Sequence, residues 1–469
     1  MPDSALSARA SRAVAEAVTG LPRQFWWLWT STLINKLGGF VVTFLALYLT
    51  TERGYSASYA GLVAALFGLG SAFASVVAGV LADRIGRRPT LVAAQLGTAL
   101  FTALLGFTDG QVAIAVVAFL VGFCNNATRP ATSAIIADIV PAEDRVRAFA
   151  LNYWAINIGF GLSAAVAGLI ATHGYLTLFL LDALSTVVCA VVIFVRIPET
   201  RPEASRTPAA AAGGAPGRPA IGLAEVFQDG RFMAVVVLNL LLALVAQQGS
   251  TTLAVDMGRA GITSTQYGLV IGLNGLLIVV LQIPLTRWME GRDRTALLVA
   301  SALFIGWGFG LTALAGSSAW FYAFTVAVWT LGEILNAPTM MGLVAELSPA
   351  EARGRYQGVY SLSWSLASFL GPAAGGVLLE RAGSGVMWGA CAVLGTVAAG
   401  GYVLLGRRPG AALAKSAVVA EAAPVPVAGT AEVPGTAEVP GTVPGPVPGA
   451  AKVPGPAPAG EPERAAAGG

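Results

Sequence analysis

The feature that most constrains this chain is a succession of apolar segments, each close to the length that crosses a lipid bilayer. A hydrocarbon core of about 30 Å requires roughly 20 apolar residues in a helix. Only 11% of the 469 residues are charged, whereas a soluble domain usually has about 25%. The sequence therefore predicts an all-α membrane protein with twelve transmembrane helices, near residues 24–50, 57–82, 89–109, 111–139, 148–172, 175–197, 231–256, 265–288, 295–316, 319–346, 355–380 and 385–406.

Two polar segments divide the chain. The segment after the sixth span is rich in Ala, Gly and Pro, and the end of the chain repeats Val-Pro-Gly five times between Val433 and Gly455. Such compositions favour flexible linkers and disorder. We expect a cytoplasmic N-terminal segment, a six-helix bundle, a cytoplasmic linker, a second six-helix bundle and a disordered cytoplasmic tail, at residues 1–23, 24–197, 198–230, 231–406 and 407–469.

The positions of the basic residues predict the orientation in the membrane. With a cytoplasmic N-terminus, 23 of the 28 Lys and Arg residues fall in cytoplasmic segments. Three others lie in outer loops, and Lys36 and Arg129 lie within helices. By the positive-inside rule, we expect a multi-pass protein of the cytoplasmic membrane with both termini in the cytoplasm.

The two halves are related by an internal repeat with a constant offset of 208 residues. The segment from Arg129 to Arg145 aligns with residues 337–353, and Pro130 matches Pro338. Because each half has six helices, the repeats are parallel, about an axis along the membrane normal. Such repeats place a substrate site near the midplane between the halves, which rock to give alternating access.

The loop after the second helix has the sequence Gly79-Val-Leu-Ala-Asp83-Arg84-Ile-Gly86-Arg87-Arg88. Position for position, it resembles the G-x-L-x-D-R-x-G-R-R loop of the major facilitator superfamily, and the resemblance covers about residues 24–406. It implies two parallel-repeat six-helix bundles, similar to those of the bacterial multidrug efflux (drug:proton antiporter) branch. It also implies that this loop clasps the halves at the cytoplasmic face and favours the outward-facing state, through Gly79, Asp83, Arg84, Gly86, Arg87 and Arg88.

A second cytoplasmic loop looks like the family's second clasp. It contains Asp138 and Arg145, and its repeat mate contains Glu346 and Arg353. An acid and an arginine at matched positions suggest ion pairs between adjacent helix ends. We expect these residues to make gating contacts rather than substrate contacts.

Two elements of the family's antiporters differ here. The segment Gly371-Pro372-Ala-Ala-Gly375-Gly376 is similar to their G-P-x-x-G-G element, in which small residues let helices approach closely. Antiporters carry this element on helix five, but here it lies on helix eleven. Ala118 occupies the helix-four position at which the drug:proton antiporters place an arginine.

Polar residues inside the membrane are candidates for substrate binding and coupling, because burying a charge in hydrocarbon costs several kcal/mol unless it is paired or faces water. In the superfamily, helices one, four, seven and ten line the cavity. Their inner polar residues form the predicted substrate and coupling set: Asn35, Lys36, Asn125, Asn126, Arg129, Gln247, Gln248, Glu333 and Asn336.

Glu333 is the predicted coupling or binding acid, since burial favours the neutral form that carries a proton. Lys36 is its predicted counter-charge across the two halves. A purely structural ion pair is the alternative. Asp182, on the peripheral helix six, is expected to be a structural acid that snorkels. The alternative is that it faces inward toward helix one or five.

Three functions remain open: a proton-coupled exporter of a small amphipathic molecule, an uptake symporter or facilitator for a metabolite, and a non-transporting sensor on the same fold. The sparse inner polar set favours efflux. The sequence has no P-loop and no nucleophile or metal constellation, so neither an enzyme nor a metal site is predicted. We expect no cofactor, the proton gradient as energy source, a small-molecule substrate, the bilayer and no nucleic acid as partners, and a monomer as the working unit.

Overall fold

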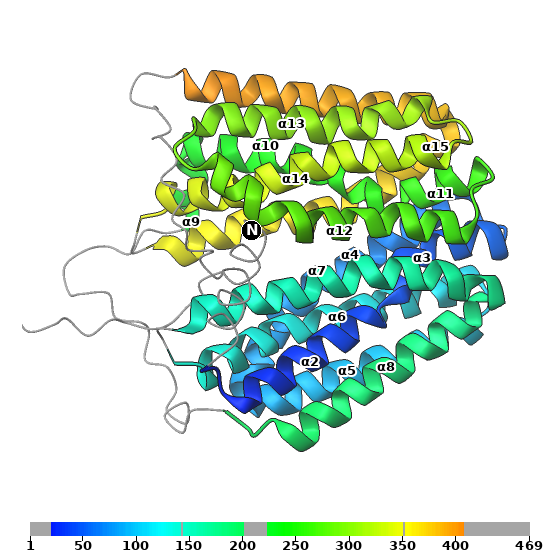
Figure 1. The fold of residues 1–469 in the computed structure, drawn as a ribbon, viewed down its shortest axis with the longest axis vertical. Helices are drawn as coiled ribbons and strands as arrows, with labels where there is room; N and C mark the ends of the chain where they lie inside the picture. The colour runs from blue at the N-terminus through cyan, green and yellow to red at the C-terminus, as the bar shows by residue number, and fades with distance from the viewer. Residues whose placement is uncertain (1–19, 142–143, 201–222, 350–351, 408–469) are drawn as a thin grey trace, which may run out of the picture. The chain divides into compact units, whose positions relative to one another are not determined.

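The computed structural model describes residues 20–141, 144–200, 223–349 and 352–407 (Figure 1). Within these ranges only the backbone is described for Val76, Gly79, Asp83, Val146, Arg353 and Gly354. Most of the predicted N-terminal segment, most of the linker and nearly all of the tail lie outside the described residues.

Helices make up both halves of the described chain. The first half contains α2 (Arg23–Leu37), α3 (Phe40–Leu47), η1 (Tyr48–Glu52), α4 (Ala57–Ile85), α5 (Arg87–Phe107), α6 (Gln111–Ile139), α7 (Arg145–Ile170), η3 (Ala171–His173) and α8 (Tyr175–Arg196). The second half contains α9 (Leu223–Gln228), α10 (Gly230–Ala246), η5 (Gln247–Ser250), α11 (Thr252–Arg259), α12 (Ser264–Met289), α13 (Arg294–Gly310), η6 (Leu311–Leu314), α14 (Ala319–Leu347) and α15 (Arg353–Gly406).

The described helices account for twelve membrane crossings. Ten helical stretches are long and apolar enough to span a bilayer, and the last of them, Arg355–Gly406, contains two helices. These two meet at Gly383, whose φ of +84° suits glycine. The remaining crossing is α14, which has 29 residues but is less apolar because it carries Trp, Tyr, Thr and Glu residues. The prediction of twelve helices therefore agrees with the structure.

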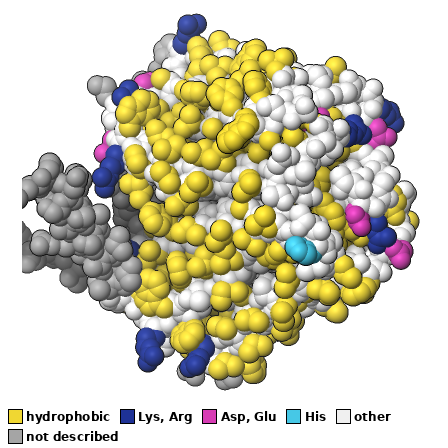
Figure 2. Space-filling model, turned by 45° about the vertical axis from the view of Figure 1, so that its right-hand side comes forward, with side chains coloured by type: hydrophobic (Ala, Val, Ile, Leu, Met, Phe, Trp, Pro, Cys, Tyr) yellow, Lys and Arg dark blue, Asp and Glu magenta, His cyan; other side chains and the backbone are white. Residues whose placement is uncertain are grey.

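The outward-facing side chains are those expected of a surface in contact with lipid. Large apolar residues such as Leu100, Val191 and Leu269 keep more than half of their surface exposed. Figure 2 shows hydrophobic side chains over most of one face, with charged side chains mainly at its margins. In a bilayer such a surface needs no polar cover.

Two of the predicted spans are broken, and these breaks are corrections to the continuous helices expected at 24–50 and 231–256. The first helix stops after Leu37 and restarts at Phe40 as α3. A β-carbon on Gly38 would lie 1.9 Å from Ser185 Oγ, so only glycine fits at this close contact. The seventh helix is interrupted by η5 and restarts at Thr252 as α11.

The halves meet along two helix pairs, α4 with α15 and α7 with α12. A β-carbon on Gly376 would lie 2.4 Å from the Ala57 carbonyl oxygen, and one on Gly275 would lie 2.5 Å from the Gly161 Cα. These helices therefore touch backbone to backbone, as small residues allow in membranes.

The buried core divides differently at the two ends of the helices. At the end that carries α3 and α11, which we call the gate end, one apolar cluster includes Phe44 from the first half and Met257 from the second. At the other end, which carries the arginines that begin α2, α5 and α13 and which we call the basic end, the clusters belong to one half each. Phe25 lies in the first-half cluster and Phe232 in the second-half cluster. The described halves thus share a core only at the gate end.

The glycine contacts generate a stability prediction. Gly376→Ala should destabilise the protein by about 1–3 kcal/mol, because its methyl group overlaps the Ala57 carbonyl and the helices must separate. Gly389→Ala, in the same element with nothing within 4 Å of its β-carbon, is the matched control. Thermal unfolding in detergent measures both, and equal melting temperatures would contradict the predicted contact.

Candidate functional site

The gate end is closed by α3 and α11. The Tyr267 hydroxyl, from α12, donates a 3.0 Å hydrogen bond to the Thr43 carbonyl oxygen of α3. The Tyr267 ring packs edge-to-face on Phe44, with 5.1 Å between ring centroids. A β-carbon on Gly258 of α11 would touch Leu47 of α3 at 2.8 Å. These contacts bury the junction of the halves.

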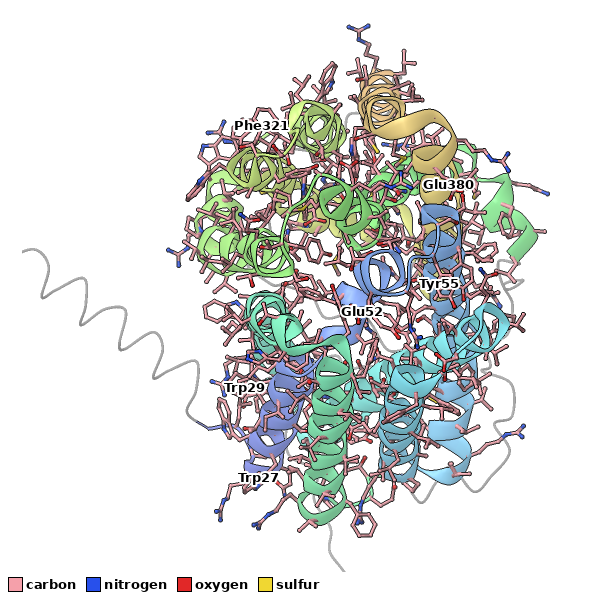
Figure 3. The ribbon with its side chains drawn as sticks, turned by 90° about the vertical axis from the view of Figure 1, so that its right-hand side faces the viewer. Trp27, Trp29, Glu52, Tyr55, Phe321 and Glu380 are labelled. Carbon is pink, nitrogen blue, oxygen red and sulfur yellow. The ribbon has the colours of Figure 1, made fainter. Side chains whose placement is uncertain are left out.

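A carboxylate crosses the same junction. Glu380 Oε2, near the middle of α15, accepts a 2.7 Å hydrogen bond from the Ser58 backbone N–H in the first turn of α4. Figure 3 looks onto this end and shows Glu380 on the second half close to Tyr55 on the first. Glu380 therefore ties the second half to the start of a first-half helix.

At the basic end, the described ion pairs stay within one half. Four hydrogen bonds between described residues of opposite halves lie at the gate end. The four described ion pairs each join residues of a single half. Together with the separate cores, these contacts describe a conformation closed at the gate end and open toward the basic end.

The described contacts of the loop after α4 hold it to α8 and the segment that follows α8. Gly86 has φ +113°, which suits glycine. The Glu199 carboxylate accepts hydrogen bonds from the Arg87 and Arg88 N–H groups, at 2.9 and 3.2 Å, and so caps α5. Arg88 also donates to the Phe194 carbonyl oxygen. These contacts fix the start of α5 to the end of α8.

The other residues of this loop give less information. Arg84 is exposed at the end of α4. The surroundings of Gly79 and of the Asp83 carboxylate lie outside the described residues, so the clasp predicted through them stays a prediction.

The described ion pairs of the second clasp join neighbouring helix ends of one half. Asp138 Oδ2 lies 3.1 Å from Arg87 Nε, and Arg145 donates to the Val140 carbonyl oxygen at 3.2 Å. Glu346 pairs with Arg294. Both pairs join adjacent helix ends, since the end of α6 lies beside the start of α5. The arrangement repeats in the second half, where α14 ends beside the start of α13. The surroundings of Arg353 are not described.

Glu333 lies half-buried in the middle of α14. Its Oε2 accepts a 3.0 Å hydrogen bond from Asn274 Nδ2 of α12, and the same amide lies 3.0 Å from Thr330 Oγ1. The charge of Glu333 also acts on Tyr153 of α7, in the first half. Glu333 therefore faces the interval between the halves, with a neutral amide as its described hydrogen-bond partner.

Lys36 belongs to a different group of charges. It packs on Gly159, and the charges that act on it are those of Arg129 and Asp182, both in the first half. The described ion pairs do not include Lys36 with Glu333, so the predicted counter-charge is not in contact. Asp182 does not snorkel: it is 6% exposed, and its Oδ2 accepts a 3.1 Å hydrogen bond from the Val41 N–H.

Arg129 is a second cation in the first half. It lies within α6, its side chain is exposed, and its charge acts on Lys36. Asn125 lies one turn before it and is partly buried. Lys36 and Arg129 thus give the first half two cationic side chains, and Glu333 gives the second half an acidic one.

Much of the remaining predicted set holds helices together. Asn126 Nδ2 donates to the Ser71 carbonyl oxygen at 2.8 Å, and Asn35 donates to Thr186 Oγ1 at 3.3 Å. Asn336 donates to Ser301 Oγ at 3.2 Å. These amides join neighbouring helices of one half, and each has a described protein partner.

The Gly-Pro element of α15, residues 371–376, packs closely against η5 and α4. Gln248 Nε2 donates to the Gly371 carbonyl oxygen at 3.0 Å, and a β-carbon on Gly375 would lie 2.0 Å from Gln248 Oε1. A β-carbon on Gly371 would lie 2.9 Å from the Gln247 side chain. A β-carbon on Gly61 of α4 would lie 2.3 Å from the Pro372 carbonyl oxygen. Gln248 is therefore a packing residue, whereas Gln247 is only partly buried.

Sequence reasoning missed Asn274 and Tyr153. It considered polar residues on the first, fourth, seventh and tenth membrane crossings. Asn274 lies on α12, the eighth crossing, and Tyr153 lies on α7, the fifth. An asparagine inside the apolar run of α12 was a usable signal, because amides are rare in lipid-facing positions.

Comparison with known proteins assigns the chain to a family. The profile of the Major Facilitator Superfamily matches residues 28–372 and 250–435. The chain belongs to this superfamily. It is therefore a multi-pass membrane transporter of the secondary type and not an enzyme.

Several relatives within the superfamily align with most of the chain. The uncharacterised transporter YhjO of Bacillus subtilis (strain 168) is 26% identical, over 77% of this chain and 87% of its own length. The Na(+), Li(+), K(+)/H(+) antiporter of Planococcus maritimus is 26% identical, over 71% and 84%. The multidrug resistance protein MdtH of Salmonella arizonae is 23% identical, over 76% and 86%.

Solved transporters share the fold. A POT family transporter in complex with 5-aminolevulinic acid superposes with a TM-score of 0.66 at 15% identity, covering 82% of this chain and 96% of that one. The nucleoside transporter NupG gives 0.68 at 13%, covering 81% and 99%. These likenesses confirm the predicted fold class.

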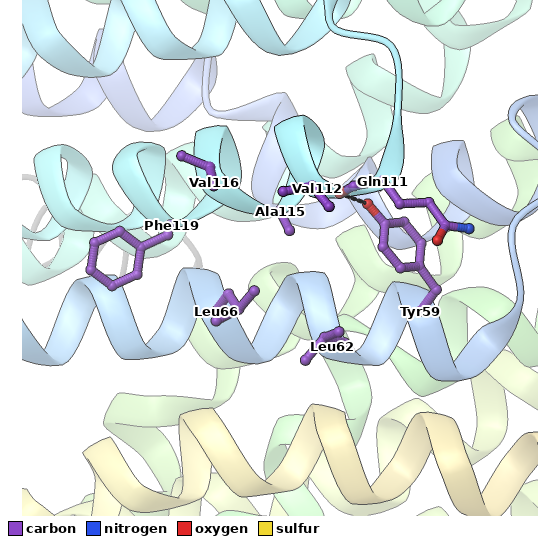
Figure 4. A pocket seen from close by; sticks show the side chains of 8 residues that line it. All are labelled: Tyr59, Leu62, Leu66, Gln111, Val112, Ala115, Val116 and Phe119. Atoms are coloured by element: carbon purple, nitrogen blue, oxygen red, sulfur yellow. Dashed lines mark hydrogen bonds between the residues drawn. The ribbon is translucent and has the colours of Figure 1, made fainter.

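A groove on the outside of this superfamily fold is distinct from the candidate site. It has a volume of about 400 Å³ and lies between α4 and α6, lined by apolar residues such as Leu62, Val116 and Phe119 (Figure 4). The Tyr59 hydroxyl closes one end by donating to the Gln111 carbonyl oxygen at 2.6 Å. Its lining contains no charged side chain and none of the polar residues of the candidate site.

The open basic end can be tested by labelling. With the native cysteines replaced, Tyr153→Cys should react readily with an impermeant maleimide added at the basic end, because Tyr153 is 48% exposed. Thr43→Cys, at a position 4% exposed in the closed junction, should react slowly with reagent added at the gate end. Labelling of Thr43→Cys from the gate end as fast as that of Tyr153→Cys from the basic end would contradict this conformation.

Proposed function

We propose that this protein exports a small amphipathic molecule across the cytoplasmic membrane in exchange for protons. It works as a monomer by alternating access, with both termini in the cytoplasm and the proton gradient as its energy source. The observation that carries the proposal is the setting of Glu333, a half-buried acid between the halves whose described hydrogen-bond partner is the neutral amide of Asn274. Such a carboxyl group can gain and lose a proton without breaking an ion pair.

The distribution of polar groups supports an amphipathic substrate. A sugar or another polar metabolite needs several free hydroxyl and amide partners. Here Asn126, Gln248 and Asn336 already have protein partners. What remains is a cationic wall on the first half, the acid Glu333 on the second, and exposed rings such as that of Tyr153. These features suit a molecule with a large apolar part and a weak charge.

The direction of transport is inferred from the open end. Arginines are concentrated at the basic end, which the positive-inside rule assigns to the cytoplasm. In the described conformation the interior is therefore offered to cytoplasmic substrates, and Arg129 is exposed within it. An exporter loads its substrate in this state.

The names of two relatives favour two related activities. MdtH is named a multidrug resistance protein, and the Planococcus maritimus protein is named a Na(+), Li(+), K(+)/H(+) antiporter. Exchange of an alkali cation for protons is thus the second candidate.

The proposal predicts the effect of Glu333→Gln. In proteoliposomes with an imposed pH gradient, this variant should lose gradient-driven exchange of a lipophilic dye, because the amide cannot carry a proton. Its expression and melting temperature should change little, since a glutamine side chain can still accept the Asn274 hydrogen bond. Dye transport is followed by fluorescence, with and without an uncoupler.

Glu290→Gln is the matched control, because it makes the same chemical change at an exposed site just after α12. It should retain exchange. Gradient-driven dye exchange by Glu333→Gln at the control rate would overturn the coupling assignment. Exchange of Na⁺ or K⁺ for protons without dye transport would replace the organic substrate with a cation.

A further inference from the structure

The break in the first helix creates a new helix start inside the membrane-spanning part of the protein. Gly39 has φ −76° and ψ +61°, outside the helical region, and α3 begins at Phe40. The first N–H groups of any helix have no partner within that helix. In a membrane such groups must be satisfied by other parts of the protein.

Asp182 of α8 supplies one of these partners. Its Oδ2 accepts the Val41 N–H at 3.1 Å, and the residue is 6% exposed. A carboxylate at a helix N-terminus interacts favourably with the helix dipole, and charge-assisted hydrogen bonds are stronger than neutral ones. A second contact holds the break against the same helix α8, because Gly38 lies directly against Ser185.

The segment that Asp182 holds is the segment that closes the gate end. Within α3, the Thr43 carbonyl oxygen accepts the Tyr267 hydroxyl, Phe44 packs on the Tyr267 ring, and Leu47 lies against Gly258. Opening of the gate end must break these cross-half contacts. The Gly38–Gly39 break lets α3 change its angle relative to α2 while this happens.

The charges around Asp182 come from helices of its own half. Lys36 of α2 is the described charged group that acts on it, and Arg129 of α6 acts on Lys36 in turn. The Thr186 hydroxyl lies on the same helix and also interacts with the carboxylate. An ionised Asp182 therefore balances part of the positive charge of Lys36 and Arg129.

The second half has a buried aspartate with a different attachment. Asp256 of α11 accepts hydrogen bonds from the Tyr322 hydroxyl at 3.1 Å and from Trp388 Nε1 at 3.0 Å. Both donors are buried side chains of the same half. Asp256 thus fixes α11 to α14 and α15 by side-chain contacts, whereas Asp182 contacts the backbone at a break.

We propose that Asp182 is a proton-linked positioning residue of transport: its carboxylate holds α3 in the closed position, and binding of a proton at Asp182 releases α3 so that the gate end opens. The proton comes from water and returns to water. By linkage, the gate-open state binds this proton more tightly than the gate-closed state. This proposal rests on the proposed function. Proton-driven export requires that the protein bind the proton while the gate end is open and release it while the gate end is closed.

A cross-link between the halves reports the gate without any substrate. In a background without Cys124, Cys189 and Cys391, the pair Leu47→Cys and Gly258→Cys places two thiols at a contact that the closed gate brings together. Because thiolate formation itself depends on pH, the cross-linking rate is divided by the rate at which an exposed single cysteine reacts with the same reagent at the same pH. This relative rate should fall as the pH is lowered, by about tenfold if the loss of the charge costs what a charge at a helix end contributes. With Asp182→Asn added, the relative rate should be low and independent of pH.

Controls separate this proposal from a general effect of buried acids. Asp256→Asn should keep the pH dependence of cross-linking, because its donors do not lie at the break. Val41→Pro removes the donated N–H but leaves the carboxyl group, and proline is tolerated in the first turn of a helix. It should abolish the pH dependence as Asp182→Asn does, and it replaces that variant if Asp182→Asn does not fold.

The outcomes distinguish the two proposals. A folded Asp182→Asn or Val41→Pro protein with the pH dependence of the parent would overturn the linkage to Asp182, and so would loss of that dependence in Asp256→Asn. Glu333→Gln should retain pH-dependent cross-linking even where it loses dye exchange. A failure of dye export with intact pH-dependent cross-linking would therefore overturn the proposed function and leave the gate mechanism standing.

Discussion

The contact on which the rest of this structure depends is the backbone-to-backbone approach of helices from opposite halves. Gly61 and Gly376 on one side, and Gly161 and Gly275 on the other, leave no room for a β-carbon. Smooth surfaces of this kind hold by dispersion and close packing. They also allow a rotation that interlocked side chains would resist. The halves can therefore be closed at one end and separate at the other without losing their central contact.

The closed and open ends use their polar groups differently. At the gate end, hydroxyl, carbonyl and carboxylate groups cross between the halves, as Tyr267 and Glu380 do. At the basic end, Arg87 and Arg294 pair with acids of their own half. These internal pairs hold each bundle together while the other bundle moves. Between the ends, most amides join neighbouring helices, and few polar groups remain to meet a substrate.

Hydropathy and the 208-residue repeat were sufficient to predict the number of helices, their approximate bounds and the parallel arrangement of the halves. The breaks at Gly38 and Gln247 were not predicted, because a glycine or glutamine pair inside an apolar run is equally compatible with a continuous helix. Individual charge partners could not be predicted either. The matched acids and arginines suggested ion pairs between adjacent helix ends, and only the folded chain shows that Asp138 lies beside Arg87. The partner of Glu333 is Asn274, an asparagine within the apolar run of α12, a helix that the family's cavity pattern does not include.

The two seams at the gate end differ in chemical kind. Between α4 and α15 the seam is held by the Glu380 carboxylate on the Ser58 N–H. Between α7 and α12 it is held by the uncharged Thr265 hydroxyl on the Gly168 carbonyl oxygen. Dissolved ions screen a charge but hardly affect a neutral hydroxyl. The salt content of the medium at the gate end therefore acts on one seam and leaves the other unchanged, so that two seams related by a repeat respond unequally to the same surroundings.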